Sequence, residues 1–134
     1  MIYLDETYGK VYYDKEIKAV YAKLIGFLSE TQFKHIIEKE LEAMYREKAT
    51  RYLIDLTELK VMLPENQKHV QQYWIPKIKK AGVQQVAFLQ PENVFGQVSM
   101  KAANVTLDGE METAYFENMG VARNWLKNKV LSHA

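Results

Sequence analysis

From Ser29 onward, segments typical of strands alternate with segments typical of amphipathic helices, and this alternation is what most constrains the fold. Short apolar runs at 52–55, 83–89 and 111–116 are separated by stretches in which apolar residues recur every three or four positions. Such alternation favours right-handed crossovers and a largely parallel sheet. Residues 1–28 are instead rich in β-forming residues broken by turn material, which predicts an antiparallel ribbon. The expected fold is therefore α/β, with one mixed β-sheet, an N-terminal antiparallel ribbon and four helices packed on the sheet.

The first helix is predicted from its start signal and its apolar face. Ser29 and Gln32 form a capping box, in which the hydroxyl and the amide each satisfy a free backbone N–H group at a helix start. The residues expected to face the core follow the i, i+3, i+4 rule: Phe33, Ile36, Ile37, Leu41 and Met44. Glu38 and Glu42 lie one turn apart among lysine and arginine neighbours. This pattern favours a solvated face over a carboxylate pair for catalysis.

Three further helices are predicted from proline, glycine and asparagine positions. Pro64 suits the first turn of the second helix, Pro76 must kink or interrupt it, and Gly82 ends it. Asn93 and Asn118 suit the N-caps of a third and a fourth helix. The apolar stripe of the second helix comprises Val70, Tyr73, Trp74 and Ile78, and that of the fourth comprises Met119, Ala122, Trp125 and Leu126.

The bulk composition places the chain in a broad class. Its 134 residues suit a single domain, residues 1–134, and contain no linker or internal repeat. The absence of cysteine excludes thiol chemistry and disulfides and is compatible with a cytoplasmic location. Eighteen basic and seventeen acidic residues provide no field of one sign for nucleic acid, and no apolar run is long enough to span a membrane. We expect a neutral small molecule or a protein as partner.

The motifs of common enzyme and cofactor classes are missing from the sequence. His35, His69 and His133 are scattered without a second metal ligand at useful spacing. No nucleophile elbow, dinucleotide-binding glycine motif or phosphate-binding loop occurs. The expectation is a non-enzymatic protein with no metal and no cofactor.

Asp55 is the most suggestive polar residue, because it ends a predicted central strand. Open α/β sheets place ligands beyond the carboxyl ends of their strands, where helix N-termini also direct free N–H groups. The same edge is expected to carry the residues that follow the strands and begin the helices. The candidate ligand- or partner-binding residues are Ser29, Asp55, Thr57, Glu58, Pro64, Asn93 and Phe95. A purely structural alternative is that Asp55 caps a turn through its own backbone.

Aromatic and sulfur-containing side chains offer a second hypothesis, an apolar pocket between helices and sheet. Its candidate lining is Tyr73, Trp74, Phe95, Met100, Tyr115 and Phe116. Residues at this spacing also serve as ordinary core, so both interpretations stay open.

Several segments together resemble the SpoIIAA-like branch of the STAS-domain proteins. They are Lys48-Ala49-Thr50-Arg51-Tyr52-Leu53-Ile54-Asp55-Leu56, Trp74-Ile75-Pro76, Ala81-Gly82-Val83 leading into Val86-Ala87-Phe88, Tyr115-Phe116, and Ala122 before Trp125-Leu126. The resemblance covers nearly the whole chain and implies a β/α domain that binds a partner. Switch-type members carry a phosphorylated Ser or Thr at the start of the second helix. Here that position reads Leu63-Pro64-Glu65-Asn66, without a hydroxyl, so we expect no phosphorylation switch.

The resemblance leads to one principal functional hypothesis and two alternatives. The principal one is a non-enzymatic STAS-like regulatory or binding module for a protein partner or a small apolar molecule, the latter because this branch is similar in fold to lipid-binding Sec14-type domains. The first alternative is a homodimeric interaction or scaffolding protein that pairs through the edge of its N-terminal ribbon. The second is an enzyme with an acid/base carboxylate at Asp55 or Glu58, for which the sequence offers no supporting second group.

Overall fold

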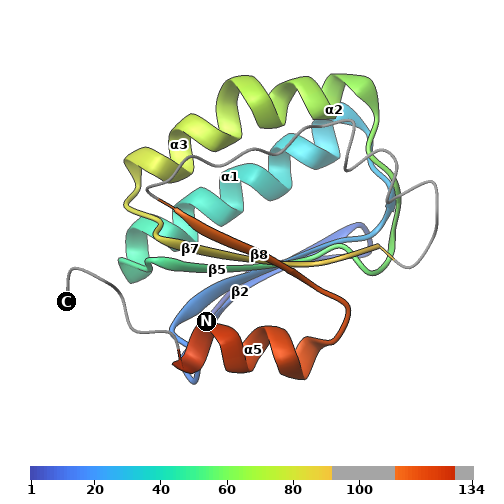
Figure 1. Ribbon diagram of the computed structural model, residues 1–134. Coiled ribbons are helices and arrows are strands. Elements are labelled where there is room, and N and C mark those ends of the chain that lie inside the picture. Colours follow the sequence, from blue (N-terminus) through green and yellow to red (C-terminus); the bar gives the residue numbers. More distant parts are fainter. Residues whose placement is uncertain (92–110, 129–134) are drawn as a thin grey trace.

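The chain forms three layers in which helices cover both faces of one sheet. The structure is a computed structural model and describes residues 1–91 and 111–128. Figure 1 shows α1 (Glu30–Glu47), α2 (Pro64–His69) and α3 (Ile75–Lys80) on one face of the sheet and α5 (Met119–Asn128) on the other. The predicted third helix, capped by Asn93, lies outside the described residues.

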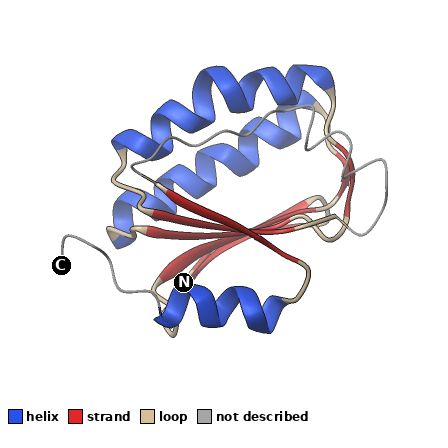
Figure 2. Ribbon diagram, in the orientation of Figure 1, coloured by secondary structure: helices blue, strands red, loops and turns tan. Residues whose placement is uncertain are grey.

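The sheet, whose strands are red in Figure 2, has six strands in the order β1-β2-β3-β5-β7-β8. Its strands are β1 (Ile2–Glu6), β2 (Gly9–Asp14), β3 (Ala19–Leu24), β5 (Arg51–Asp55), β7 (Gln85–Leu89) and β8 (Glu112–Phe116). The first three pair antiparallel, and β3, β5, β7 and β8 pair parallel. The predicted mixed sheet with an N-terminal antiparallel ribbon is therefore confirmed.

Side-chain alternation along the central strands builds two cores. On β5, Tyr52 and Ile54 enter the larger core under α1 and the α2–α3 helices, whereas Leu53 enters the smaller core under α5. Because both faces are covered, β5 and β7 are buried almost throughout. The apolar run at 52–54, which the sequence predicted to be a buried central strand, is therefore confirmed as one.

Helix α1 has the predicted start and the predicted buried face. Gln32 N–H donates to Ser29 Oγ at 3.1 Å, and Ser29 N–H donates to Gln32 Oε1 at 3.1 Å, which completes the capping box. At its other end Lys48 adopts a left-handed conformation with φ of 52°. The backbone N–H of Ala49 then donates to the carbonyl oxygen of Met44, five residues earlier, which is the outer hydrogen bond of a Schellman motif.

The second predicted helix is a single rod with a π-helical segment in its middle. Pro64 opens α2, η1 (Val70–Trp74) continues it as a π-helix, and α3 follows. Pro76 has no N–H group for the carbonyl four residues earlier, and a π turn is a known way to absorb such a break. The interruption of the helix predicted at Pro76 therefore takes the form of a π-helical segment, in which the helix widens locally. Gly82, with φ of 92°, ends the rod as expected.

Two smaller features complete the described fold. Strands β4 (Gly26–Phe27) and β6 (Leu59–Val61) form a short parallel pair that the sequence pattern did not predict. Helix α5 begins at the predicted cap, because Val121 N–H donates to Asn118 Oδ1 at 3.1 Å. Arg123 pairs with Asp14 and Glu16 and so ties α5 to the turn after β2.

Candidate functional site

Asp55 lies at the carboxyl end of β5, as predicted, but its oxygens are already engaged. The residue is 4% exposed. Tyr21 Oη donates to Asp55 Oδ2 at 2.6 Å, and the backbone N–H and hydroxyl of Thr57 donate to Oδ1 at 3.0 and 2.6 Å. Burial, followed by the hydrogen bond to Asp55, raises the pKa of Tyr21 far above its ordinary value. The Asp55–Thr57 contacts are those of the turn-capping alternative.

The other predicted site residues have structural roles at the same edge of the sheet. Glu58 forms an ion pair with Lys23 of β3, which lies beside Asp55 in the parallel register. Ser29 caps α1 and Pro64 opens α2, and both are exposed. The structure therefore brings Asp55 and Thr57 into contact and leaves Glu58 engaged with a lysine instead. Asn93 and Phe95 lie outside the described residues.

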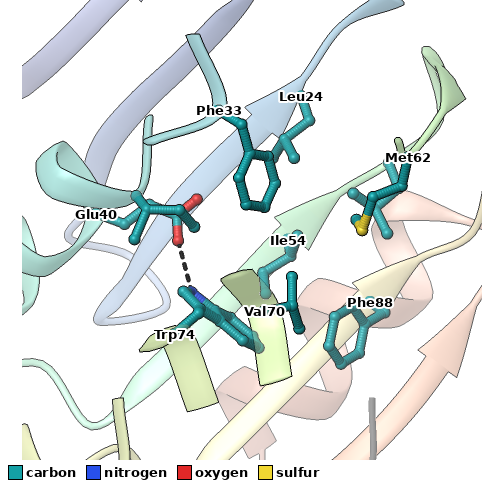
Figure 3. A pocket seen from close by; sticks show the side chains of 10 residues that line it. Leu24, Phe33, Glu40, Ile54, Met62, Val70, Trp74 and Phe88 are labelled. Atoms are coloured by element: carbon teal, nitrogen blue, oxygen red, sulfur yellow. Dashed lines mark hydrogen bonds between the residues drawn. The ribbon is translucent and has the colours of Figure 1, made fainter. Parts of the chain in front are cut away.

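A cavity of about 30 Å³ lies between α1, the α2–α3 rod and the sheet. The side chains that line it are Leu24, Phe33, Ile37, Glu40, Ile54, Leu56, Met62, Val70, Trp74 and Phe88 (Figure 3). All of them are buried, and Glu40 alone among them is ionisable. This volume corresponds to room for two or three waters, since one water needs roughly 10–15 Å³ on this measure.

Glu40 is the functional candidate that the sequence reasoning missed. Its side chain is 1% exposed, and Trp74 Nε1–H donates to its Oε1 at 3.0 Å. The same N–H group lies 3.4 Å from the hydroxyl oxygen of Tyr52. Figure 3 shows the second carboxyl oxygen on the side of Phe33, away from Trp74. Among the residues described, none forms an ion pair with this carboxyl group.

Burial in this apolar setting raises the pKa of the Glu40 carboxyl to about 8, and the Trp74 hydrogen bond offsets only part of that effect. Removal from water disfavours the charged form of an acid, so the carboxyl is largely neutral at pH 7. A neutral carboxyl group retains an O–H donor, which the ionised form lacks.

A sequence signal for Glu40 exists, although it is weak. Glu40 lies four residues after Ile36 and four before Met44, on the apolar side of α1. An acid at such a position is either turned out to solvent or buried for a reason. The sequence cannot distinguish these cases, because the rotation of a helix over a sheet depends on packing.

Of the residues predicted to line an apolar pocket, Trp74 lines this cavity, whereas Tyr73, Tyr115 and Phe116 do not. Trp74 lines the cavity and is buried, as its helical spacing indicated. Tyr73 is 39% exposed, since the π-helical segment shifts which side chains face the sheet. Tyr115 is also exposed, and Phe116 packs in the smaller core under α5. Phe95 and Met100 lie outside the described residues.

The fold has a counterpart of known structure. An uncharacterised protein of the DUF3478 family from Shewanella loihica, described as having a SpoIIAA-like fold, superposes with a TM-score of 0.60 and 18% sequence identity. The match covers 87% of this chain and 90% of that one. No protein-family model and no curated protein matches the sequence. The chain therefore has a SpoIIAA-like fold, as its sequence resemblance implied.

Two features are absent from the described residues. No helix within residues 1–91 and 111–128 is long and apolar enough to cross a membrane. In the same two ranges, no group of three or more potential metal-ligating side chains occurs.

Proposed function

We propose that this SpoIIAA-like domain is a binding module for a small apolar molecule, which occupies the cavity beside Glu40. The observation that carries the proposal is a buried carboxyl group that lines an otherwise apolar cavity. Burying an acid without an ionic partner is destabilising, and perturbed acids of this kind concentrate at functional sites. A hydrocarbon side chain at position 40 would fill the same space without that cost.

The size of the cavity limits what enters without rearrangement. Any guest larger than two or three waters requires neighbouring side chains to move. Met62, which lines the cavity, has an unbranched side chain that repacks readily. The π-helical segment beside Val70 and Trp74 is of the kind often found at functional sites. Both features support adaptation on the rod side of the cavity.

The proposal is one of binding and not of catalysis. The carboxylate of the enzyme hypothesis, Asp55, accepts three hydrogen bonds from Tyr21 and Thr57. A carboxylate so engaged is a poor general base, because abstracting a proton requires a free oxygen within hydrogen-bond reach of the substrate.

Methyl NMR with a panel of small apolar probes tests the proposal. We expect probe-induced shifts at Ile54, Met62 and Val70, and we expect Leu56→Phe, which fills the cavity, to abolish them. Leu126→Phe makes the same change in the core under α5 and serves as the matched control. Shifts that persist in Leu56→Phe, or that map only to the surface, would contradict the proposal.

A homodimeric interaction module is the second candidate, and one observation favours it. Edge strand β1 presents Ile2 with its side chain 68% exposed. Unpaired edges of this kind accept another strand. Native mass spectrometry of the purified protein reports a dimer and a retained small molecule in one spectrum. If pairing through β1 forms a dimer, Ile2→Lys will shift the distribution to monomer, whereas a dimer unaffected by this change would exclude that edge.

A further inference from the structure

Resting on the proposed function, we infer that Glu40 selects the guest: its carboxyl group donates a hydrogen bond to an oxygen acceptor on an otherwise apolar molecule, such as a carbonyl or an ether. The domain would therefore take small ketones, esters or ethers in preference to hydrocarbons of the same shape.

The geometry around Glu40 separates the roles of its two oxygens. Oε1 accepts the indole N–H of Trp74 at 3.0 Å, which fixes the orientation of the carboxyl plane. The other oxygen is turned away from that indole toward Phe33, another residue of the cavity wall (Figure 3). A neutral carboxyl whose Oε1 is engaged as an acceptor carries its proton on the other oxygen. Because the surface of the cavity is itself apolar, a guest reaches that O–H group only once side chains of the cavity wall move.

The surroundings favour a neutral acceptor over a cationic guest. Glu40 accepts the Trp74 indole N–H from the rod, the same N–H group lies near the Tyr52 hydroxyl of β5, and every other residue of the cavity wall is apolar. Burial raises the pKa of the carboxyl to about 8, so at pH 7 it is largely neutral and a cationic amine would lose its hydration without gaining a carboxylate. A neutral oxygen atom loses less hydration and gains one hydrogen bond.

The same arrangement makes selection depend on pH. Below the pKa of Glu40 the O–H donor is present, and above it the carboxylate repels an acceptor oxygen. Preference for the acceptor-bearing guest should therefore be full at about pH 6 and lost as the pH rises through about 8.

Two probes of matched shape test the inference: cyclopentanone, and methylenecyclopentane, in which a carbon replaces the oxygen. Affinities are measured by methyl NMR titration between about pH 6 and about pH 9.5, on either side of the Glu40 pKa of about 8. We expect wild-type protein to bind the ketone about threefold to tenfold more tightly at low pH, the range for one net hydrogen bond. That preference should disappear at high pH.

Two variants show whether Glu40 is the cause. Glu40→Gln keeps a donor and an acceptor but does not titrate, so its preference for the ketone should persist at all pH values. Glu40→Leu removes the donor and should bind both probes equally. If Glu40→Leu does not fold, the comparison of Glu40→Gln with wild type across the pH range is enough to show whether Glu40 causes the preference for the ketone.

The outcomes distinguish this inference from the proposed function. Equal binding of both probes by wild-type protein, or a preference retained by wild type at high pH, would overturn the role of Glu40 while leaving the cavity a binding site. Absence of cavity shifts with either probe would overturn both.

Discussion

At the scale of single residues, Trp74 has two functions in the structure. Its indole is 3% exposed, packs against Tyr52 and Phe88, and donates the hydrogen bond that orients Glu40. We expect Trp74→Ala to lower the free energy of unfolding by about 3–5 kcal/mol, the range for a large aromatic lost from a core. Tyr73→Ala, at an exposed neighbouring position, should cost less than about 1 kcal/mol. Chemical denaturation measures both, and a loss below about 1 kcal/mol for Trp74→Ala would contradict its core position.

The buried acid also predicts how stability depends on pH. Glu40 has a pKa of about 8 in the folded protein, against about 4.3 for an ordinary glutamate in an unfolded chain. Between these values the folded state binds the extra proton, so stability falls as the pH rises through this window and levels off above it. The Glu40→Gln variant has no carboxyl group at this position, so its stability does not fall in this way. Its stability relative to wild type should therefore increase across the window, by an amount on the order of a few kcal/mol.

Urea denaturation at a series of pH values measures that difference. Glu38→Gln, an exposed position on the same helix, controls for the loss of one carboxyl group from α1. A difference between Glu40→Gln and wild type that stays constant from acid to alkaline pH would mean that the carboxyl has the same pKa in the folded and the unfolded protein.

At the scale of elements, the C-terminus of α1 carries a conformation that its residue disfavours. Lys48 has φ of 52°, in the left-handed region where a side chain is strained and glycine is not. We expect Lys48→Gly to raise the free energy of unfolding by up to about 1 kcal/mol. The greater conformational entropy of glycine in the unfolded chain offsets part of this gain. Lys39→Gly, inside the same helix, should instead lower it by roughly 0.5–1 kcal/mol. Thermal and denaturant unfolding give both values, and losses of equal size in the two variants would contradict this account.

The elements differ in how far the sequence determined them. The start of α1 and the start of α5 were predictable, because a capping side chain bonds to backbone only a few residues away. The break near Pro76 was also predictable, but its form was not. Whether a helix kinks or widens depends on what it packs against. The π-helical segment that results turns Tyr73 outward and keeps Trp74 inward.

At the scale of the whole molecule, the layered arrangement predicts a gradient of local stability. Strands β5 and β7 are paired on both edges and covered on both faces, whereas β1 is an edge strand. We expect amides of β5 and β7 to exchange with solvent only when the whole domain unfolds, and those of β1 to exchange orders of magnitude faster. Hydrogen exchange followed by NMR measures this. In Trp74→Ala, protection of β5 and β7 should fall by the same free energy as global stability, and a smaller fall would show that these strands open by another route.

The sequence by itself determined the succession along the chain of the main sheet's strands and the described helices, the starts of α1 and α5, the antiparallel ribbon and the resemblance to SpoIIAA-like proteins. Those features follow from side-chain periodicity and from bonds between near neighbours in the chain. Only the tertiary structure decided that Tyr21, 34 positions before Asp55, occupies one of its oxygens, and that Glu40 lies inside a cavity with Trp74. The register between parallel strands and the rotation of α1 over the sheet set both contacts. These depend on how distant side chains fill a shared core, which no local pattern specifies.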